Sequence, residues 1–491
     1  MKEYQPTIGL EIHVELRTKS KMFCSCFNDP DEKQPNINVC PICMGHPGTL
    51  PVINEEALKK VIKTGLALQG TIPEYSKFDR KNYFYPDLPK GYQISQYDMP
   101  LCKGGWLEVR PPDITISGGR TSQNHKIDIT RIHLEEDTGR LIHPPATGFS
   151  LVDFNRAGIP LMELVTEPDI TSAKEAKAFA EELRLTLRYL GVSDADMEKG
   201  EMRVEANISL SDDKELGTKV EIKNLNSFRS VEYGINYEIE RQSKALKAGK
   251  KVVQETRGWD AAKEVTVSQR KKEEAHDYRY FPEPDLPPLQ FKAEDVKIIK
   301  GEIPELPQAK RERFKKEYGL GREEIEMFVQ NKELSGYFEK VISEASDPKY
   351  IKLSSNYLIT DLQSLLGGEL VTDKDFKITP ENFAEFIGLI AQGAISSKIA
   401  KTVLQEMFVT GGDPSNIIEE KGLTQITGEK EIEEAVQVVV SQNPQAVADF
   451  KKGKGNALQF LIGKVMSQTR GKASPEITGS LLKKLLIDKR E

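Results

Sequence analysis

The sequence lacks the segments that would place it in or across a membrane. No apolar run in its 491 residues is long enough to span a bilayer, and residues 1–4 lead into a strand-like segment without the apolar stretch of a signal peptide. With 30% charged and 38% apolar residues, the composition is typical of a folded globular protein. We therefore expect a cytoplasmic protein with no membrane partner, divided into about two to four domains.

Three familiar catalytic and nucleotide-binding motifs are also absent. The chain contains neither the Gly-x₄-Gly-Lys-Ser/Thr phosphate loop nor the Gly-x-Gly-x-x-Gly dinucleotide fingerprint, so any nucleotide must bind through another architecture. It has no Gly-x-Ser-x-Gly nucleophile elbow either. The histidines, carboxylates and cysteines therefore remain the candidates for a functional site.

Cysteine is scarce but concentrated. Four of the five cysteines lie within 20 residues, as the pairs Cys24-Ser-Cys26 and Cys40-Pro-Ile-Cys43. This spacing favours a tetrahedral Zn²⁺ site, because four thiolates close the coordination shell of a structural zinc. Loose reduced thiols or a redox pair are the alternatives. The remaining cysteine, Cys102, has strand-like neighbours and no adjacent histidine base, so we predict a small buried residue there.

Charge is distributed unevenly along the chain. The net charge is −7, but residues 451–491 hold ten basic and three acidic residues, a net +7, which leaves −14 for residues 1–450. A basic end on an acidic body suggests a polyanionic partner for the C-terminal region. A solvated helical face explains the same charges equally well.

Hydrophobic periodicity predicts an α+β fold with an antiparallel sheet. Residues 8–16 alternate as a half-buried strand, and residues 202–208 and 220–223 read as two further strands that pair. A helix with a continuous apolar stripe is expected from Ser172, with Glu175 completing a capping box, to Gly191. A second helix is expected over residues 228–249.

The domain organisation follows from breaks in these patterns. The sequence turns helical after residues 304–307, and residues 410–414 mark a further break. We predict a catalytic domain over 1–294, a helical domain over 295–409 and a small helical tail domain over 410–491.

Two proline-stiffened loops resemble each other. Residues 83–89 read Tyr-Phe-Tyr-Pro-Asp-Leu-Pro, and residues 280–287 read Tyr-Phe-Pro-Glu-Pro-Asp-Leu-Pro. They could form paired walls of one cleft or mark a duplication, and chance similarity is a third explanation, because the shared string is short.

Histidines and carboxylates offer a candidate metal site. Glu11, His13 and Glu15 share one face of the first predicted strand, and the strings around His133 and Glu163 supply similar groups. Such a set suits Mg²⁺ or Mn²⁺, which commonly carry nucleotide phosphates. Arg203 and Lys223 could then neutralise phosphate charge. An exposed sheet face decorated with charge remains the alternative.

Five strings identify a family resemblance that runs from about residue 7 to the C-terminus. They are Gly9-Leu-Glu-Ile-His-Val-Glu-Leu16, Cys40-Pro-Ile-Cys-Met-Gly-His-Pro-Gly48, Phe154-Asn-Arg-Ala-Gly-Ile-Pro-Leu-Met-Glu163, Val220-Glu-Ile-Lys-Asn-Leu-Asn-Ser-Phe228 and Asp277-Tyr-Arg-Tyr-Phe-Pro-Glu-Pro-Asp-Leu286. The chain resembles the B subunits of the bacterial and organellar aspartyl/glutamyl-tRNA amidotransferases.

The resemblance implies a fold, a reaction and partners. The fold would be a kinase-like catalytic domain related to glutamine synthetase, followed by a helical domain and a YqeY-like tail. In the implied reaction, ATP phosphorylates the side-chain carboxylate of misacylated Glu-tRNA(Gln) or Asp-tRNA(Asn), and ammonia displaces the phosphate. The ammonia would come from an amidase (A) subunit that hydrolyses glutamine, and a small (C) subunit would complete a heterotrimer.

The resemblance also assigns roles to individual residues. It implies that His13, Glu136 and Glu163 bind Mg²⁺ and act in catalysis with Glu11, although the adjacent Glu135 and Glu136 could exchange roles. The implied ATP-binding residues are Arg203, Glu205, Lys223 and Asn224. The implied zinc ligands are Cys24, Cys26, Cys40 and Cys43.

The basic tail fits a tRNA partner. Lysine contacts to phosphates give most of the affinity for RNA and little of the sequence reading, so we expect Lys452, Lys454 and Lys472 on the RNA side. Two other functions remain open. A non-catalytic scaffold that presents tRNA would keep full activity in the His13→Ala protein, and a metal-dependent hydrolase would release product without ATP.

Overall fold

The computed structural model describes residues 4–110, 124–145, 148–213, 215–271, 277–344, 348–368, 370–423, 429–452, 454, 456–469 and 472–488. The chain divides into two compact units, Met1–Pro307 and Gln308–Glu491. The first combines a sheet with helices and the second is helical, which confirms the α+β class. The finer boundaries at 294 and 409 stay predictions. None of the helices in the described ranges has the length and hydropathy needed to cross a bilayer.

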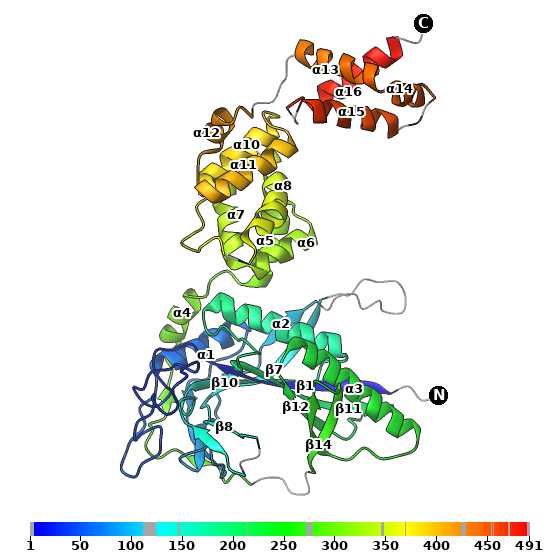
Figure 1. Cartoon of the computed structure of the whole chain (residues 1–491). Coiled ribbons are helices and arrows are strands. Elements are labelled where there is room, and N and C mark those ends of the chain that lie inside the picture. The colour runs from blue at the N-terminus through cyan, green and yellow to red at the C-terminus, as the bar shows by residue number, and fades with distance from the viewer. Residues whose placement is uncertain are drawn as a thin grey trace. The chain divides into compact units, whose positions relative to one another are not determined.

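A large sheet organises the first unit (Figure 1). Its strands, over the described residues, run in the order β14-β13-β12-β11-β1-β10-β7-β5, and β6 also pairs with β7. All neighbours are antiparallel except β12 and β13. The strands are β1 (Gln5–Glu15), β5 (Cys102–Lys103), β6 (Trp106–Val109), β7 (His125–Glu136), β10 (Pro160–Thr166), β11 (Met202–Ser211), β12 (Val220–Leu225), β13 (Glu255–Asp260) and β14 (Val265–Lys271).

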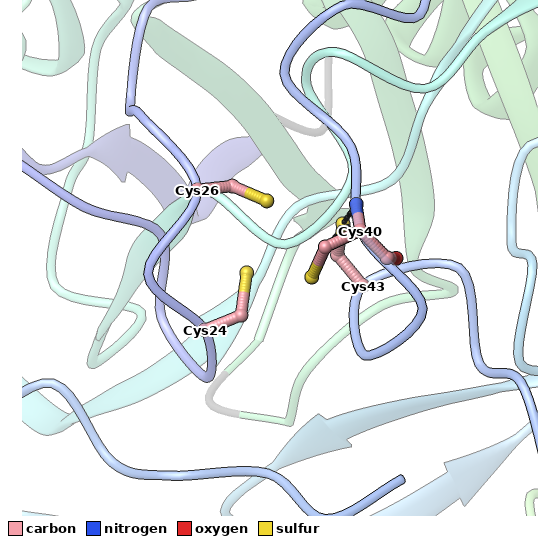
Figure 2. A group of neighbouring side chains, drawn as sticks. All are labelled: Cys24, Cys26, Cys40 and Cys43. Atoms are coloured by element: carbon pink, nitrogen blue, oxygen red, sulfur yellow. Dashed lines mark hydrogen bonds between the residues drawn. The ribbon is translucent and has the colours of Figure 1, made fainter.

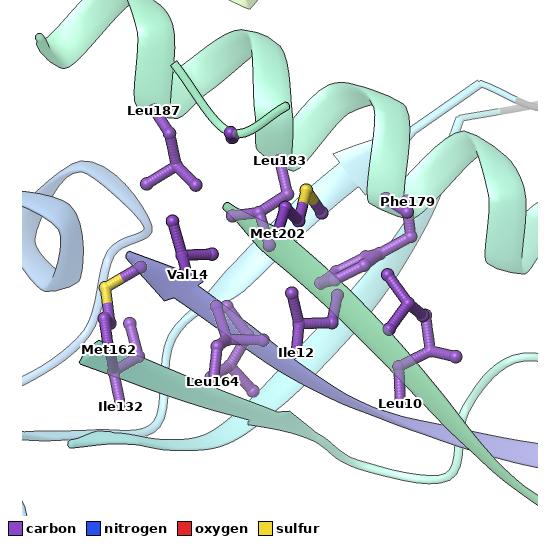
Figure 3. Close-up of a cluster of buried hydrophobic side chains, with 14 of the residues drawn as sticks. Leu10, Ile12, Val14, Ile132, Met162, Leu164, Phe179, Leu183, Leu187 and Met202 are labelled. Carbon is purple, nitrogen blue, oxygen red and sulfur yellow. The ribbon is translucent and has the colours of Figure 1, made fainter. Parts of the chain in front are cut away.

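Two long helices, α2 (Ala173–Leu190) and α3 (Phe228–Lys247), bury one face of this sheet. Leu10, Ile12 and Val14 of β1 are at most 1% exposed, and Figure 3 shows them meeting Phe179 and Leu183 of α2. This packing confirms the predicted strand and the apolar stripe of the first predicted helix. Because alternate residues of a strand face opposite sides, the other face of β1 is left to its polar residues.

The ends of α2 follow the predicted signals. The Ser172 hydroxyl accepts from the backbone N–H of Glu175 at 3.3 Å, and the Glu175 carboxylate accepts from the N–H of Thr171 at 2.7 Å. The carboxylate thus reaches one residue further back than a standard capping box. Gly191 ends the helix with φ of 65°, a left-handed conformation that favours glycine.

Smaller elements surround the large sheet. A three-stranded sheet has the order β15-β3-β4, while β16 pairs with β2 and β8 pairs with β9. Their bounds are β2 (Tyr75–Ser76), β3 (Asp79–Asn82), β4 (Tyr92–Ser95), β8 (Arg140–Ile142), β9 (Leu151–Asp153), β15 (Phe281–Pro282) and β16 (Leu289–Gln290). Helices α1 (Glu55–Ala67) and α4 (Ala293–Gly301) complete the unit.

The two similar loops meet on the three-stranded sheet. Phe281 of β15 lies opposite Arg80 of β3, and the N–H of Asn82 donates to the carbonyl of Tyr278 at 2.9 Å. Because the pairing is antiparallel, residues 83–89 continue from one end of β3, whereas residues 283–287 continue past its other end. The two segments thus share one small sheet but leave it at opposite ends, and paired walls of one cleft stay a prediction.

The second unit consists of helices in its described residues. They are α5 (Pro307–Tyr318), α6 (Arg322–Gln330), α7 (Lys332–Glu344), α8 (Lys349–Asn356), the π-helix η1 (Tyr357–Leu362), α9 (Gln363–Leu366), α10 (Pro380–Ala391), α11 (Ser397–Thr410), α12 (Pro414–Glu420), α13 (Glu429–Gln442), α14 (Pro444–Lys451), α15 (Asn456–Gln468) and α16 (Pro475–Asp488). Helices α13–α16 share a core of their own that includes Ile432, Leu461, Val465 and Leu482. Helix α12 packs instead on α10 and α11.

Candidate functional site

The four clustered cysteines converge in space (Figure 2). The Sγ atoms of Cys24, Cys26, Cys40 and Cys43 all lie within 4.8 Å of one another, and those of Cys40 and Cys43 are 3.9 Å apart. A tetrahedral zinc with Zn–S bonds of about 2.3 Å places its sulfurs about 3.8 Å apart. The cluster is therefore compatible with a structural zinc.

The segment that carries these cysteines is braced against another part of the unit. The N–H of Asn36 donates to the Asp153 carboxylate at 3.1 Å, and the N–H of Asn38 donates to the side-chain oxygen of Asn155 at 2.9 Å. These contacts tie the stretch between the two cysteine pairs to the last residue of β9 and to the turn that follows it.

One thiol of the cluster is poised to ionise. The hydrogen bond from the Cys24 thiol, with help from the Lys21 charge, lowers the pKa of Cys43 to about 5 although burial opposes the shift. The buried Lys21 amine lies 3.9 Å from Cys43 Sγ. A thiolate, the form that binds metal, is therefore favoured at Cys43.

Histidines and glutamates gather on the polar face of the large sheet. His13 of β1 lies opposite Glu163 of β10, and Glu163 lies opposite His133 of β7. The His13 and His133 Nε2 atoms are 3.2 and 3.3 Å from the same carboxylate oxygen, Oε2 of Glu163. One carboxylate thus sits between two imidazoles.

Two further carboxylates complete this group, which we call the His–Glu cluster: Glu11, His13, His133, Glu135 and Glu163. Glu135 Oε1 is 3.7 Å and Glu11 Oε1 is 3.9 Å from the Nε2 atom of His13. Ligand atoms lie within 4.8 Å of one another in each of two overlapping triads, Glu11–His13–Glu163 and His133–Glu135–Glu163. Either triad has the donor set and the spacing to hold a hard divalent cation.

The electrostatics of the cluster favour a cation. Burial alone would raise the pKa of Glu163, but the charge of His133 and the hydrogen bonds from both imidazoles hold it well below its usual range. Burial opposes protonation of His133, yet Glu163 and Glu135 raise its pKa to about 9. Burial opposes protonation of His13 too, and its hydrogen bond to Glu163 again raises the pKa. The protons on His13 and His133 therefore supply positive charge that balances the glutamates, and a bound cation would replace these protons.

Glu136 does not join this group. Because residues alternate along β7, Glu135 shares the face of His133 and Glu136 points away. The Glu136 carboxylate pairs with the Lys90 amine and accepts from the N–H of Ile94 at 2.9 Å. It lines a small pocket together with Cys24 and Cys43. The geometry thus places Glu135 where the sequence-based assignment placed Glu136.

The expected nucleotide contacts lie beside the cluster on β11 and β12. Arg203 is opposite His13, and Glu205 is opposite Glu11. Lys223 pairs with Glu205 at 2.8 Å, and Asn224 has φ of 66° next to a register shift between β11 and β12. The structure brings these four residues to one region of the polar face.

Arg203 has a second partner. Its Nη2 atom donates to the Asp137 carboxylate at 2.8 Å, and Arg156 Nε lies 3.6 Å from the same oxygen. Burial would raise the pKa of Asp137, but these two arginines lower it to about 2. Burial and the charge of Asp137 raise the pKa of Glu15 to about 8. Asp137 therefore orients the guanidinium of Arg203 along the sheet face.

The tail lysines lie in the second unit. Lys452 is exposed just after α14, Lys454 pairs with Asp449 at 3.1 Å, and Lys472 is half-buried before α16. They do not contact one another through any described hydrogen bond or ion pair.

Cys102, as predicted, is a buried residue. A side chain at Gly65 or Gly70 would collide with its sulfur. Its thiol is therefore part of the packing between α1 and β5 rather than of a reactive site.

Lys81 was missed by sequence reasoning. Its Nζ atom lies 5.3 Å from the ring centre of Tyr278 and 6.0 Å from that of Tyr83. Although burial opposes protonation, the charges of Glu135 and Glu163 raise the pKa of Lys81. A lysine on a short strand carries no motif, and only the pairing of β3 with β15 reveals its surroundings.

Comparison with known proteins gives consistent matches along the whole chain. The GatB/GatE catalytic domain matches residues 6–297, and the GatB domain matches residues 336–486. The B subunit of the aspartyl/glutamyl-tRNA(Asn/Gln) amidotransferase from Thermotoga maritima is 50% identical over 489 residues, 98% of this chain and 99% of the relative. Those from Carboxydothermus hydrogenoformans and Brevibacillus brevis are each 47% identical, covering 98% and 99% of this chain and 99% of each relative.

The pair between Lys90 and Glu136 yields a stability prediction. Both side chains are buried, at 9% and 4% exposure, so Glu136→Leu leaves a buried ammonium without its partner and should cost about 3–5 kcal/mol. The double variant Lys90→Met/Glu136→Leu removes the unpaired charge and should recover part of that loss, while the N–H of Ile94 still lacks its acceptor. Urea unfolding followed by tryptophan fluorescence reports on this unit, because Trp106 and Trp259 both lie in it. An equal loss of unfolding free energy in the single and double variants would contradict the pairing of Lys90 with Glu136.

Proposed function

This chain belongs to the GatB/GatE family, and B subunits of aspartyl/glutamyl-tRNA(Asn/Gln) amidotransferases are among its relatives. On that premise we propose that it is the ATP-dependent activating subunit of such an enzyme. Its substrate is the side-chain carboxylate of misacylated Glu-tRNA(Gln), Asp-tRNA(Asn) or both. The product is the corresponding amide, Gln-tRNA(Gln) or Asn-tRNA(Asn).

The chemistry requires two steps. A carboxylate is a poor electrophile, so one of its oxygens first attacks the γ-phosphorus of ATP, giving an acyl phosphate and ADP. Ammonia then attacks the acyl carbon, the C–N bond forms, and the phosphate leaves with the C–O bond electrons while nitrogen loses a proton. An amidase partner that hydrolyses glutamine supplies the ammonia, and a small third subunit completes the complex. The missing nucleophile elbow agrees with that division of labour.

The observation that carries the proposal is the His–Glu cluster with cations at its edge. The donor set fits Mg²⁺, with His13 and Glu163 as ligands, Glu135 in place of Glu136, and Glu11 nearby. The Nε2 atoms of His13 and His133 both point at one oxygen of Glu163, so the nitrogen and oxygen donors of the cluster face a common point. Mg²⁺ bound there would neutralise phosphoryl charge.

The chain's own cations support the same step. Lys223 and Arg203 flank Glu11 and His13 on the sheet face, where they can bind phosphate oxygens of ATP, with Asn224 beside them. Asp137 holds the Arg203 guanidinium in place. Lys81 stays protonated on the other side of the cluster and can bind the substrate carboxylate. Positioning and electrostatics of this kind provide most of the catalysis in phosphoryl transfer.

We further propose that the four clustered cysteines bind a structural Zn²⁺. Four thiolates leave no open coordination position, so the ion folds the segment and takes no part in the reaction. The segment is held against Asp153 and Asn155, and Cys24 and Cys43 line the same pocket as Glu136. The zinc would therefore stabilise one wall of the catalytic unit.

The main test is ADP formation by the chain assembled with its amidase and small subunits, with and without glutamyl-tRNA. The wild type should form ADP only with the charged tRNA. His13→Ala should reduce the rate of ADP formation by at least about 100-fold, because removal of a metal ligand costs more than removal of a residue that only supports a ligand. His143→Ala, which removes an exposed histidine of the first unit, should keep the wild-type rate. ADP formation that survives His13→Ala would point to a scaffold, and product without ATP would point to a hydrolase.

A metal-binding measurement distinguishes the roles of the adjacent Glu135 and Glu136. Mn²⁺ is a spectroscopic substitute for Mg²⁺, and Glu135→Gln should weaken its binding by at least about 10-fold. Glu136→Gln should leave Mn²⁺ affinity close to that of the wild type. The reverse result would return the ligand role to Glu136.

The zinc proposal predicts a change in metal content. Cys43→Ser should reduce bound zinc from about one ion per chain to a trace and lower the melting temperature. Cys102→Ala also removes a cysteine, but one outside the cluster, so its zinc content should match the wild type. Elemental analysis of both purified variants, with calorimetry before and after chelation, makes the comparison. Full zinc content in Cys43→Ser would exclude the four-thiolate site.

We also propose that the lysines of the C-terminal tail bind tRNA. Their loss should then weaken tRNA binding and leave the rate of the chemical step unchanged. Replacing Lys452, Lys454 and Lys472 with Ala should raise KM for the charged tRNA, leave kcat unchanged and reduce the salt slope by about one for each lost phosphate contact. The matched control replaces Lys247, Lys250 and Lys251, exposed at the end of α3 in the first unit. A fall in kcat at saturating tRNA would count against the assignment.

A further inference from the structure

Two tyrosines outside the His–Glu cluster stack face to face. The ring centres of Tyr97 and Tyr280 are 4.2 Å apart, and their planes are inclined by only 11°. Tyr97 follows β4 and Tyr280 precedes β15, so both are held by the three-stranded sheet. The Tyr97 side chain is 60% exposed. An aromatic platform thus lies at the surface, although its components are far apart in the chain.

The platform borders the reacting centre. The hydroxyl of Ser95, two residues before Tyr97, donates to Glu135 Oε2 at 3.1 Å. Burial raises the pKa of Tyr280 to about 12, and the charges of Glu135 and Glu163 contribute, so its hydroxyl lies within electrostatic reach of the cluster. The stack therefore runs from the edge of the His–Glu cluster towards solvent.

A cation and further rings accompany the stack. Tyr278 lies 6.0 Å from both Tyr280 and Tyr83, and the Lys81 amine lies over Tyr278. Arg279 has a side chain that is 84% exposed. Aromatic faces beside lysine and arginine are the groups that bind the bases and phosphates of single-stranded RNA ends.

The chemistry of the substrate indicates which part of the tRNA lies beside the His–Glu cluster. The amino acid is esterified to the ribose of the 3′-terminal nucleoside, so the ribose, the ester and the amino-acid chain link the base to the side-chain carboxylate that reacts. Resting on the proposed function, we propose that the exposed face of the Tyr97–Tyr280 stack binds the base of the 3′-terminal nucleoside of the charged tRNA. The stack would thereby position the aminoacyl ester over the His–Glu cluster.

The sheet order separates this subsite from that of ATP. Arg203 and Lys223 lie on β11 and β12, on one side of β1, whereas Glu135, which accepts from Ser95, lies on β7 at the other side. ATP and the RNA end would therefore approach the cluster from opposite sides. This arrangement is the one that transfer of a phosphoryl group between them requires.

Steady-state kinetics of the assembled enzyme test the subsite. Tyr97→Ala should raise KM for glutamyl-tRNA by about 5- to 150-fold, the contribution of one base–aromatic stack, without changing kcat or KM for ATP. Tyr97→Phe keeps the ring and should stay within about twofold of the wild type. The matched control is Tyr233→Ala, which removes a 40% exposed tyrosine from α3 on the opposite side of the sheet.

A small probe isolates the terminal nucleoside from the rest of the RNA. Adenosine carrying glutamate through a 3′-amide is a stable mimic of the charged end and should inhibit the wild type competitively with glutamyl-tRNA. Its inhibition constant should rise in Tyr97→Ala by the same factor as KM. Because the probe lacks the remaining nucleotides, this result cannot arise from the tail domain.

The outcomes separate this inference from the proposed function. An increase in KM for ATP alone would assign the stack to the ATP base and overturn the inference. Unchanged KM and inhibition constants in Tyr97→Ala would overturn it as well, while ATP-dependent amidation by the wild type would still stand. Failure of the wild type to amidate glutamyl-tRNA would remove the proposed function and this inference with it.

Discussion

The first unit depends on the two different faces of β1. Leu10, Ile12 and Val14 are buried beneath α2 and α3, and this packing fixes which face of the strand is apolar. A shift of register by one residue would turn every side chain to the opposite face, so the hydrophobic core also determines where the polar residues point. The position of His13 on the open face is thus a consequence of packing on the closed face.

The polar face is stable because its charges compensate one another. Glu163 is buried yet ionised, since two imidazoles surround it. Asp137 is likewise held ionised by Arg203 and Arg156. Buried charges of this density are costly unless paired, and such clusters are typical of functional sites. The proposed binding of a metal and phosphates rests on this balance of carboxylates against cations.

Distant segments assemble the surroundings of this face. The carbonyl of Tyr278 bonds to the side chain of Asn82 across 196 positions of the chain, and the N–H of Asn36 bonds to Asp153 across 117. The first contact brings the tyrosine-rich segment beside Lys81, and the second holds the cysteine segment in place. The sheet that carries the His–Glu cluster therefore owes its two neighbouring segments to a few long-range contacts rather than to one continuous motif.

The sequence by itself determined β1, α2, the strand pair β11–β12 and the cysteine cluster, since each rests on periodicity or spacing among near neighbours. It also supplied His13 and Glu163. Only the tertiary structure decided that Glu135 rather than Glu136 joins them, and that Lys81 and Tyr280 lie beside the cluster. The physical reason is strand register: long-range backbone hydrogen bonds and core packing set it, and no local pattern encodes which distant residues will face each other.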